Sequence, residues 1–430
     1  MKTDQIQKVH KDWYKLDLSA IVYPTLQRRD FSSVYRLSVL LKEDIDPEIL
    51  QRAVNLTMPR FPTYKAAIRK GVFWRYLEPN DRPGPFVQED VKNPCQPMHF
   101  KGNNRYLVRI YYYRNRIALE AHHSLGDGTG GMCVLQTLTA TYLRLKGHSE
   151  IENGGFVLDI LGIPDPGELE DAYMKYANAK VCPPRPGEKT YRVRGTKEPF
   201  YTLNIIDGIM SVSEVMQVAK SYNATITEYL NSVLLYALMR KQESEWHLKL
   251  RPVKIAMPVN LRRFFPSRTL RNFITMIYPG IDPRLGEYTF EEIVTQVHNY
   301  MRYYLNEKLL RGDITTNAET QRNPFIRIVP LFIKDLVVRQ FYTKIQDKNS
   351  SAGLTNMGAL KVPETMKPYI ERFDIYMGQP FSTRTNCAIA SFEDILTINF
   401  ASSIAETDVE RLFFRKLVQG GIHVKIESNR

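Results

Sequence analysis

The sequence predicts a mixed α/β protein built from two lobes. Segments with the alternating apolar pattern of strands and segments with the three-to-four-residue apolar spacing of helices occur in both halves of the chain. Prolines gather at Pro183, Pro184 and Pro186, where the apolar periodicity fades, and 430 residues suffice for two ordinary domains. We therefore expect an N-terminal lobe at residues 1–180, a crossover linker at 181–195 and a C-terminal lobe at 196–430.

The N-terminal lobe should open with a strand followed by a helix. Residues 34–41 are rich in β-formers, and Asp46-Pro47 then supplies a helix N-cap and a first-turn proline. Residues 72–77 read as another strand. The inward face of the helix is expected to carry Ile49, Leu50, Ala53, Val54 and Leu56.

A hairpin and a helix should follow, with a histidine-rich segment between them. Residues 106–113 pair naturally with residues 117–123 across Arg114-Asn115, where Asn115 is available for a positive φ. A helix from about residue 129 to 146 comes next, and Gly147 is its expected stop. The segment His122-His123-Ser124-Leu125-Gly126-Asp127-Gly128 is therefore predicted at a strand-to-helix junction.

The second half repeats the mixture of elements. Capping boxes at residues 225–228 and 289–292 should each begin an apolar helix. The other predicted elements are strands at 252–259, 373–377, 385–391 and 395–401 and a helix at 408–417.

Composition narrows the classes of function. The net charge of +13 favours anionic ligands in general, but no nucleic-acid-binding signature accompanies the basic residues. The chain shows neither a secretory h-region nor a transmembrane stretch, which predicts a cytoplasmic protein. Its four cysteines, Cys95, Cys133, Cys182 and Cys387, lack the spacing of a disulfide framework or a zinc site.

The two adjacent histidines should point to opposite faces of their strand. His123 shares a face with Ile117, Leu119 and Ala121, which marks it as the inward one of the pair. Because His122 points away from it, a His-His-Asp metal site is disfavoured. Gly126 and Gly128 flank Asp127 and permit a tight turn, so that Asp127 can organise the site through a buried ion pair.

This arrangement suits acyl transfer from a thioester. A neutral imidazole can take the proton of an attacking hydroxyl, and a thiol leaves with little acid assistance. Backbone N–H groups at residues 128–130, beginning with Gly128, could stabilise the oxyanion. Cys133, in the first turn of the helix, leaves a covalent acyl-enzyme open, whereas the glycine run lacks the Lys-Ser/Thr of a phosphate loop.

The motif HHxxxDG resembles that of the coenzyme A-dependent acyltransferase superfamily, which includes chloramphenicol acetyltransferases and the condensation domains of peptide synthetases. The chain as a whole is most similar to the alcohol acetyltransferase family. Further resemblance lies at residues 13–17, 23–24, 71–74, 258–262 and 424–429.

The resemblance implies two chloramphenicol acetyltransferase-like α/β sandwich lobes around a central channel, with His123 as the base and Asp127 in a structural role. It implies that Asp127 pairs with Arg262, or alternatively Arg263, and that Thr355 and Asn356 donate hydrogen bonds near the channel unless they form an ordinary turn. Asp374 is expected to be structural, and His122 to support the site.

The implied activity is transfer of an acetyl or other acyl group from acyl-CoA, a co-substrate rather than a tightly bound cofactor, to a small alcohol. Transfer to an amine and transfer from an acyl carrier protein stay open, as does an inactive protein that binds an acyl chain or a partner. No metal is expected.

Overall fold

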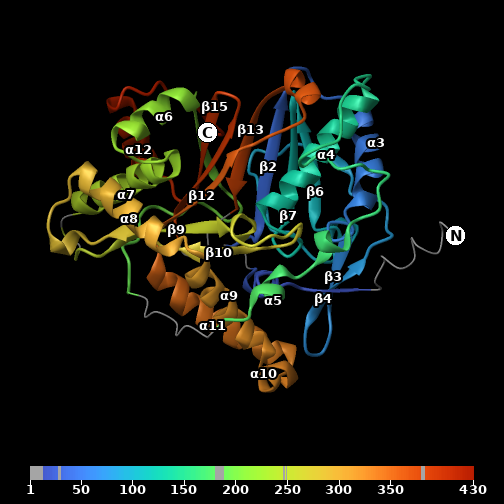
Figure 1. Ribbon diagram of the computed structural model, residues 1–430, viewed down its shortest axis with the longest axis horizontal. Coiled ribbons are helices and arrows are strands. Elements are labelled where there is room, and N and C mark those ends of the chain that lie inside the picture. Colours follow the sequence, from blue (N-terminus) through green and yellow to red (C-terminus); the bar gives the residue numbers. More distant parts are fainter. Residues whose placement is uncertain (1–12, 28–30, 180–187, 246, 248, 379–382) are drawn as a thin grey trace.

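Three sheets form the framework of the part of the chain that the computed structural model describes, which comprises residues 13–27, 31–179, 188–245, 247, 249–378 and 383–430 (Figure 1). The first sheet has the strand order β13-β2-β7-β6-β5, and the second has the order β10-β9-β12-β14-β15-β8-β16, with β11 paired to β9. A small third sheet has the order β1-β4-β3. The prediction of a mixed α/β protein with two sheet-based lobes is confirmed.

The strands of the first sheet are β13 (Ile370–Met377), β2 (Val34–Leu41), β7 (Arg116–His122), β6 (Val108–Tyr113) and β5 (Val87–Glu89). Those of the second are β10 (Ile274–Ile277), β9 (Val253–Asn260), β12 (Ala352–Ala359), β14 (Thr385–Phe392), β15 (Ile395–Ser402), β8 (Asn204–Ser211), β16 (Lys425–Ser428) and β11 (Gly280–Ile281). The third consists of β1 (Tyr14–Lys15), β4 (Arg75–Pro79) and β3 (Ala66–Lys70).

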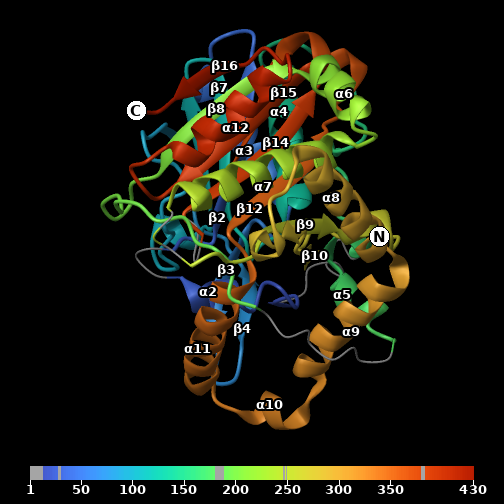
Figure 2. The ribbon, with the colours of Figure 1, turned by 90° about the vertical axis from the view of Figure 1, so that its left-hand side faces the viewer.

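Helices cover the two main sheets (Figures 1 and 2). In the first lobe, α4 (Gly128–Leu145) packs on β2 and β7, and α3 (Pro47–Thr57) packs on α4. In the second lobe, α7 (Ile226–Ser244) contacts β9 and is flanked by α8 (Phe290–Tyr304) and α12 (Asp408–Gln419). The remaining helices are α2 (Tyr23–Leu26), α5 (Ala172–Tyr176), α6 (Val212–Ser221), α9 (Glu307–Arg322), α10 (Pro324–Ile328) and α11 (Leu331–Asn349).

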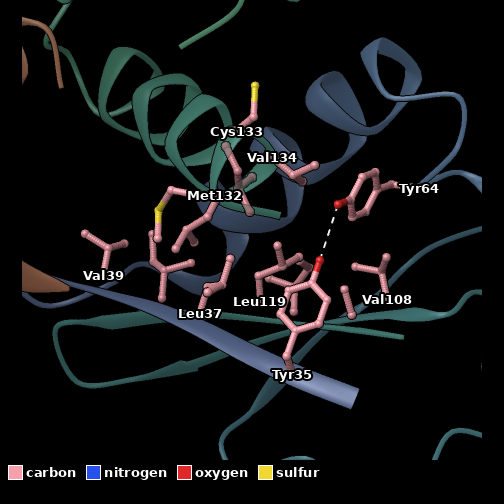
Figure 3. Packing of buried hydrophobic residues seen from close by; sticks show 14 of the residues in the cluster. Tyr35, Leu37, Val39, Tyr64, Val108, Leu119, Met132, Cys133 and Val134 are labelled. Atoms are coloured by element: carbon pink, nitrogen blue, oxygen red, sulfur yellow. Dashed lines mark hydrogen bonds between the residues drawn. The ribbon is translucent and has the colours of Figure 1, made fainter. Parts of the chain in front are cut away.

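The core of the first lobe lies between α4 and the first sheet. Met132 and Val134 of the helix belong to the same buried cluster as Leu37 of β2 and Leu119 of β7 (Figure 3). At the edge of this core the hydroxyl groups of Tyr35 and Tyr64 point toward one another and lie 3.3 Å apart. The packing fixes the first turn of α4, and therefore Asp127, against the end of the sheet.

Strand β13 joins the first sheet although it comes from the second half of the chain. It pairs antiparallel with β2 over residues 370–377, with Asp374 opposite Ser38. On the side facing the second lobe, the Asn399 side chain accepts the backbone N–H of Ile375, and the Tyr376 hydroxyl donates to Asp207. The two lobes are thus tied together by a strand that the linker boundary assigns to the C-terminal lobe.

Several of the predicted helix starts are confirmed. Asp46 accepts hydrogen bonds from the amides of Glu48 and Ile49 at the start of α3. Both capping boxes are present, at the N-termini of α7 and α8. Gly147 follows α4 with φ +119°, a conformation that L side chains rarely adopt.

Other predictions are wrong in detail. Residues 72–74 form the turn between β3 and β4 rather than part of a strand, and the Val72 side chain is 71% exposed. Leu56 is 48% exposed instead of facing inward, because the buried stripe of α3 continues to Thr57. In the β6–β7 turn the positive φ belongs to Arg114, not Asn115. The helices between residues 307 and 349 were not foreseen.

Residues 188–195 of the expected linker are described and form neither a helix nor a strand. Residues 180–187, including Pro183, Pro184, Pro186 and Cys182, lie outside the described residues, so the boundary remains a prediction. Residues 1–12 and Gln379-Pro380 also lie outside them. Among the helices that are described, none is both long and apolar enough to cross a bilayer.

Candidate active site

His123 lies directly after β7, with its imidazole in contact with two tyrosine rings. Its backbone amide donates to the Ser33 carbonyl at 2.8 Å, which holds the residue beside the start of β2. The Tyr23 ring of α2 stacks on the imidazole at a centroid distance of 4.8 Å, and the Tyr35 ring lies at 4.6 Å with a 50° tilt. Both tyrosine rings therefore pack directly against the imidazole and restrict its rotation.

His122 points to the other face of the sheet, as strand alternation predicts, but that face is also buried. Its side chain is fully enclosed, and the Phe100 ring meets it edge-on at 5.4 Å. The expectation that only one histidine faces a buried side is therefore wrong, because the segment carrying Phe100 covers the second face. The Ser124 amide donates to His122 Nδ1 at 3.2 Å, which requires that this nitrogen carry no proton.

Burial lowers the pKa of both imidazoles. Desolvation lowers the pKa of His122 to about 3. It lowers that of His123 to about 4, although the Asp127 charge and the Asn272 side chain act in the opposite direction. His123 is therefore neutral at pH 7, the form that a general base requires. Its Nδ1 is buried, which leaves Nε2 as the nitrogen that can reach a substrate.

Asn272 anchors His123 from the second lobe, a contact that no sequence pattern predicts. Its Nδ2 donates to the His123 carbonyl at 2.9 Å and to Asp17 Oδ2 at 3.1 Å. Asp17 is fully buried, accepts the Ala20 amide at 2.8 Å and lies 3.7 Å from Arg271 Nε. Asn272, Asp17 and Arg271 thus hold the His123 backbone to the N-terminal segment and the second lobe together.

Asp127 is the N-cap of α4 and does not hydrogen-bond to His123. Its Oδ1 accepts the amides of Thr129 at 3.1 Å and Gly130 at 3.2 Å. Its Oδ2 accepts Arg262 Nη1 at 2.8 Å and the Phe273 amide at 2.9 Å. Each oxygen therefore has two donors, one pair from α4 and the other from the second lobe.

Arg262, not Arg263, is the partner of this carboxylate. In the 3-10 turn at the end of β9, its Nη1 reaches Asp127, its Nε donates to the Thr269 carbonyl at 2.9 Å and its Nη2 donates to the Arg271 carbonyl at 2.5 Å. The expected ion pair between the lobes is present, and both side chains are largely buried. A guanidinium that donates a hydrogen bond from each of its three nitrogens acts as a rigid clamp.

The glycines of the motif are required for close packing rather than for an unusual turn. Neither Gly126 nor Gly128 has a positive φ, so the backbone conformation alone does not require glycine at either position. A side chain at Gly126 or Gly130 would collide with the Leu270 carbonyl and the Tyr64 hydroxyl, and one at Gly131 would collide with Tyr35. The backbone of the motif can therefore approach the second lobe at Leu270 only without Cβ atoms.

Only part of the proposed oxyanion hole fits the geometry. The amides of Thr129 and Gly130 bind Asp127, so the expectation that residues 128–130 all offer donors is wrong. Within the described chain, the Gly128 amide has no hydrogen-bond acceptor. Met357 of β12 packs against Gly128, because a Cβ there would lie 3.0 Å from its sulfur.

Thr355 and Asn356 lie on β12, so the alternative of an ordinary turn is wrong. Thr355 is half-buried, two residues from the Met357 contact. The Asn356 amide donates to Thr227 Oγ1 at 2.9 Å and accepts the Gly358 amide at 2.7 Å, so it ties β12 to α7. This leaves Asn356 one N–H for a substrate.

Cys133 and Asp374 have structural surroundings. Burial raises the pKa of the Cys133 thiol to about 12, and its Sγ lies 3.2 Å from the Phe156 carbonyl. This disfavours the acyl-enzyme that the sequence left open, since the thiolate is the nucleophile. Asp374 is fully buried beside Arg372 Nε at 3.2 Å.

Across the residues that are described, no group of three or more His, Cys, Asp or Glu side chains is arranged to hold a metal.

Comparisons with known proteins place the fold among acyltransferases and condensation domains. The chain is similar to F. sporotrichioides TRI101 complexed with coenzyme A and T-2 (TM-score 0.63, 13% identity, 98% of this chain and 100% of that one). It is also similar to the trichothecene 15-O-acetyltransferase TRI3 of Fusarium sporotrichioides (0.59, 13%, 95% and 94%). A third similar structure is the starter condensation domain of rhizomide synthetase with bound C8-CoA (0.59, 12%, 97% and 97%). No family model and no curated protein sequence matches.

These similarities extend over nearly the whole chain and show the fold alone. They support two lobes of the condensation-domain type. The alcohol acetyltransferase resemblance and the central channel remain predictions. Two surface hollows of the described structure lie elsewhere, one on α8 and one at residues 189–195.

We expect Asp127→Asn to destabilise the protein by on the order of 3 to 5 kcal/mol, because it leaves the Arg262 charge buried without its partner. Urea denaturation monitored by fluorescence measures the change. Asp165→Asn is a matched control, because it breaks the exposed pair with Arg268 and should cost at most about 1 kcal/mol. Equal effects of the two substitutions would contradict the clamp.

Proposed function

We propose that this protein transfers an acyl group from acyl-CoA to the hydroxyl of an alcohol, with His123 as the general base. The observation that carries the proposal is a neutral imidazole, packed against two tyrosine rings, at a junction where Asn272 and Arg262 reach in from the second lobe. Similar structures support it, since one is a 15-O-acetyltransferase and two hold coenzyme A or C8-CoA.

In the proposed reaction, His123 Nε2 takes the proton of the acceptor hydroxyl while its oxygen attacks the thioester carbonyl. The carbonyl oxygen becomes negative in the tetrahedral intermediate, where the Gly128 amide can donate to it. The C–S bond then breaks, and the thiolate receives the proton from the imidazolium. The acceptor proton thus ends on the thiol, and no other reactant is needed.

The low pKa of His123 suits a short-lived imidazolium. A base with a pKa of about 4 returns its proton readily to a thiolate, whose conjugate acid has a pKa near 8.5. The Asp127 carboxylate favours the imidazolium through space, without direct contact. Asn272, which binds the His123 carbonyl, acts in this scheme as a positioning residue.

Release of free thiol tests the function. Purified protein is incubated with acyl-CoA donors of two to eight carbons and a panel of alcohols and amines, and the thiol is titrated with a chromogenic disulfide. Acceptor-dependent release with alcohols supports the proposal. Release with amines alone would show N-acyl transfer instead, and no release with any pair would favour an acyl-binding protein.

His123→Ala should lower kcat by about 10²- to 10⁴-fold, the usual contribution of a general base. His122→Ala should instead lower the thermal midpoint, because it empties a buried position beside Phe100, and should retain more turnover per folded molecule. Circular dichroism melts and single-substrate kinetics separate the two effects. Wild-type turnover in His123→Ala would refute the mechanism.

The decline in activity on the acid side of the pH–rate profile should occur at an unusually low pH. Since neutral His123 is the active form and its pKa is about 4, kcat/KM should stay level down to about pH 5 and fall below it. An unshifted histidine would give a midpoint near 6.5. A midpoint near 6.5 would show that the imidazole is more hydrated than the structure indicates.

The same shift predicts the pH dependence of stability. The His123 imidazole becomes protonated near pH 6.5 in the unfolded chain and near pH 4 in the folded chain. Unfolding between these pH values is therefore accompanied by proton uptake at His123. The stabilisation is complete above pH 6.5 and is lost as the pH falls toward 4. Rates are therefore measured with enzyme diluted briefly from pH 7, with activity regained at pH 7 as the control.

A further inference from the structure

The turn between β3 and β4 meets α10 and the start of α11 at one end of the molecule (Figures 1 and 2). The Leu331 amide donates to the Val72 carbonyl at 2.8 Å. Lys334 Nζ donates to the Phe73 carbonyl at 2.9 Å and to the Arg327 carbonyl at 3.1 Å. These contacts join two segments that are more than 250 positions apart in the sequence into one continuous surface.

This surface exposes large apolar side chains from both segments. The turn exposes Val72 and Trp74, and α10 exposes Phe325 (76%) and Ile328 (68%). Monomeric proteins seldom expose apolar side chains in such a group unless the group binds another surface. We call the surface formed by residues 72–74 and 325–337 the apolar end.

Helix α11 adds an apolar face that is directed to solvent. Phe332, Ile333, Leu336 and Val337 are all exposed. Their positions i, i+1, i+4 and i+5 place them together on one side of the helix. A surface helix ordinarily turns such a stripe toward the core of its own protein, so α11 has the reverse orientation.

Polar contacts on the other side of α11 hold it in this orientation. Asp335 accepts Arg75 Nη2 of β4 at 2.6 Å and the Thr25 hydroxyl of α2 at 2.8 Å. One turn later, Arg339 Nε donates to the Thr25 carbonyl at 2.8 Å. The charged side chains thus face the protein, and the apolar face of α11 is left for another surface.

The charges at the apolar end are mainly positive. Residues 322–340 contain four basic residues, and their only acidic residue is Asp335, which pairs with Arg75. Of the basic residues, Arg327 is exposed within the apolar end, and Lys70 is exposed just before the turn. Apolar side chains accompanied by cations are typical of surfaces that bind anionic bilayers.

A second copy of this chain fits the apolar end less well. A two-fold interface would place the same surface against itself. Arg327 and Lys70 of one copy would then lie near those of the other, which is electrostatically unfavourable when water is excluded. The phosphates of an anionic bilayer have the opposite charge, and the protruding end can meet a flat surface.

We propose that the apolar end docks on the surface of a bilayer that contains anionic lipids. The exposed side chains of α10, α11 and the β3–β4 turn enter the headgroup region, and the neighbouring cations bind lipid phosphates. The protein lies on the bilayer and does not span it. This docking is independent of the reaction proposed for His123.

Sedimentation with vesicles measures the docking. Wild-type protein should bind vesicles of equal parts phosphatidylcholine and phosphatidylglycerol, and Phe332→Gln/Leu336→Gln should weaken the binding roughly tenfold or more, because two apolar side chains no longer leave water. Leu161→Gln/Phe200→Gln makes the same exchange at exposed positions elsewhere and should bind as wild type. Equal loss in both variants, or no binding by the wild type, overturns the proposal.

The lipid charge is tested by comparing these vesicles with pure phosphatidylcholine. Lys70→Gln/Arg327→Gln should lose most of the preference for the anionic vesicles. Arg52→Gln/Lys220→Gln removes the same charge from exposed positions on α3 and α6 and should keep the preference. Equal binding of the wild type to both vesicle types overturns the assignment to anionic lipid.

Trp74 reports which surface enters the headgroups. Its emission should shift to shorter wavelength when anionic vesicles are added, because the exposed indole leaves water. Trp74→Phe should bind as tightly and lose this shift. A shift that persists in Trp74→Phe would place the contact on another part of the chain and refute the docking surface.

Sedimentation velocity without lipid tests the alternative occupant. The wild type should be a monomer at the concentrations used for vesicle binding. A wild-type dimer that Phe332→Gln/Leu336→Gln converts to a monomer would show that a second copy covers the apolar end, and it would refute docking on a bilayer. Circular dichroism melts confirm that each variant is folded.

Discussion

The geometry of the site depends on one buried carboxylate. Asp127 has two oxygens and four donors, and those donors belong to two different lobes. One pair begins α4 directly after the strand that positions His123, and the other fixes Arg262 and the Phe273 amide of the second lobe. The absence of Cβ atoms at Gly126 and Gly130 lets the second lobe come close enough to complete this set. The junction therefore works as a single unit, since each lobe supplies two of the four donors that hold the Asp127 carboxylate in place.

Two adjacent histidines acquire different chemistry from this frame. Both are neutral because both are desolvated, but His122 uses Nδ1 to accept a backbone amide and is enclosed beside Phe100. His123 keeps Nε2 for another group, while Asn272 holds its carbonyl and tyrosine rings limit its rotation. Burial thus selects the protonation state, and hydrogen bonding selects which imidazole can act. Because these contacts already fix the His123 side chain, a bound substrate has few further side-chain torsions to restrict at this site.

The sequence was informative where the determinants are local. Asp46, the capping boxes and the strand-to-helix junction at Asp127 are encoded within a few residues, so periodicity and cap chemistry located them. Arg262 came from family resemblance, because no local pattern joins residues 135 positions apart. Asn272 and Tyr23 were missed for the same reason, as each reaches His123 only after the chain has folded. Among the unforeseen helices at 307–349, α11 has a weak amphipathic pattern and exposes Phe332, Leu336 and Val337, so its apolar spacing does not mark a buried face.

Strand β13 has a consequence for how the protein is made. The first sheet needs residues 370–377 beside β2, more than three hundred positions earlier in the chain. While the ribosome is still extending the second half, β2 lacks its neighbour and presents an open edge of the kind that templates aggregation. Pairings so distant in sequence also close slowly, because a long loop must be ordered first. The strand that completes the first sheet is therefore synthesised late, and β2 stays unpaired on that side until then. A chaperone that covers this edge would benefit the growing chain over most of its translation.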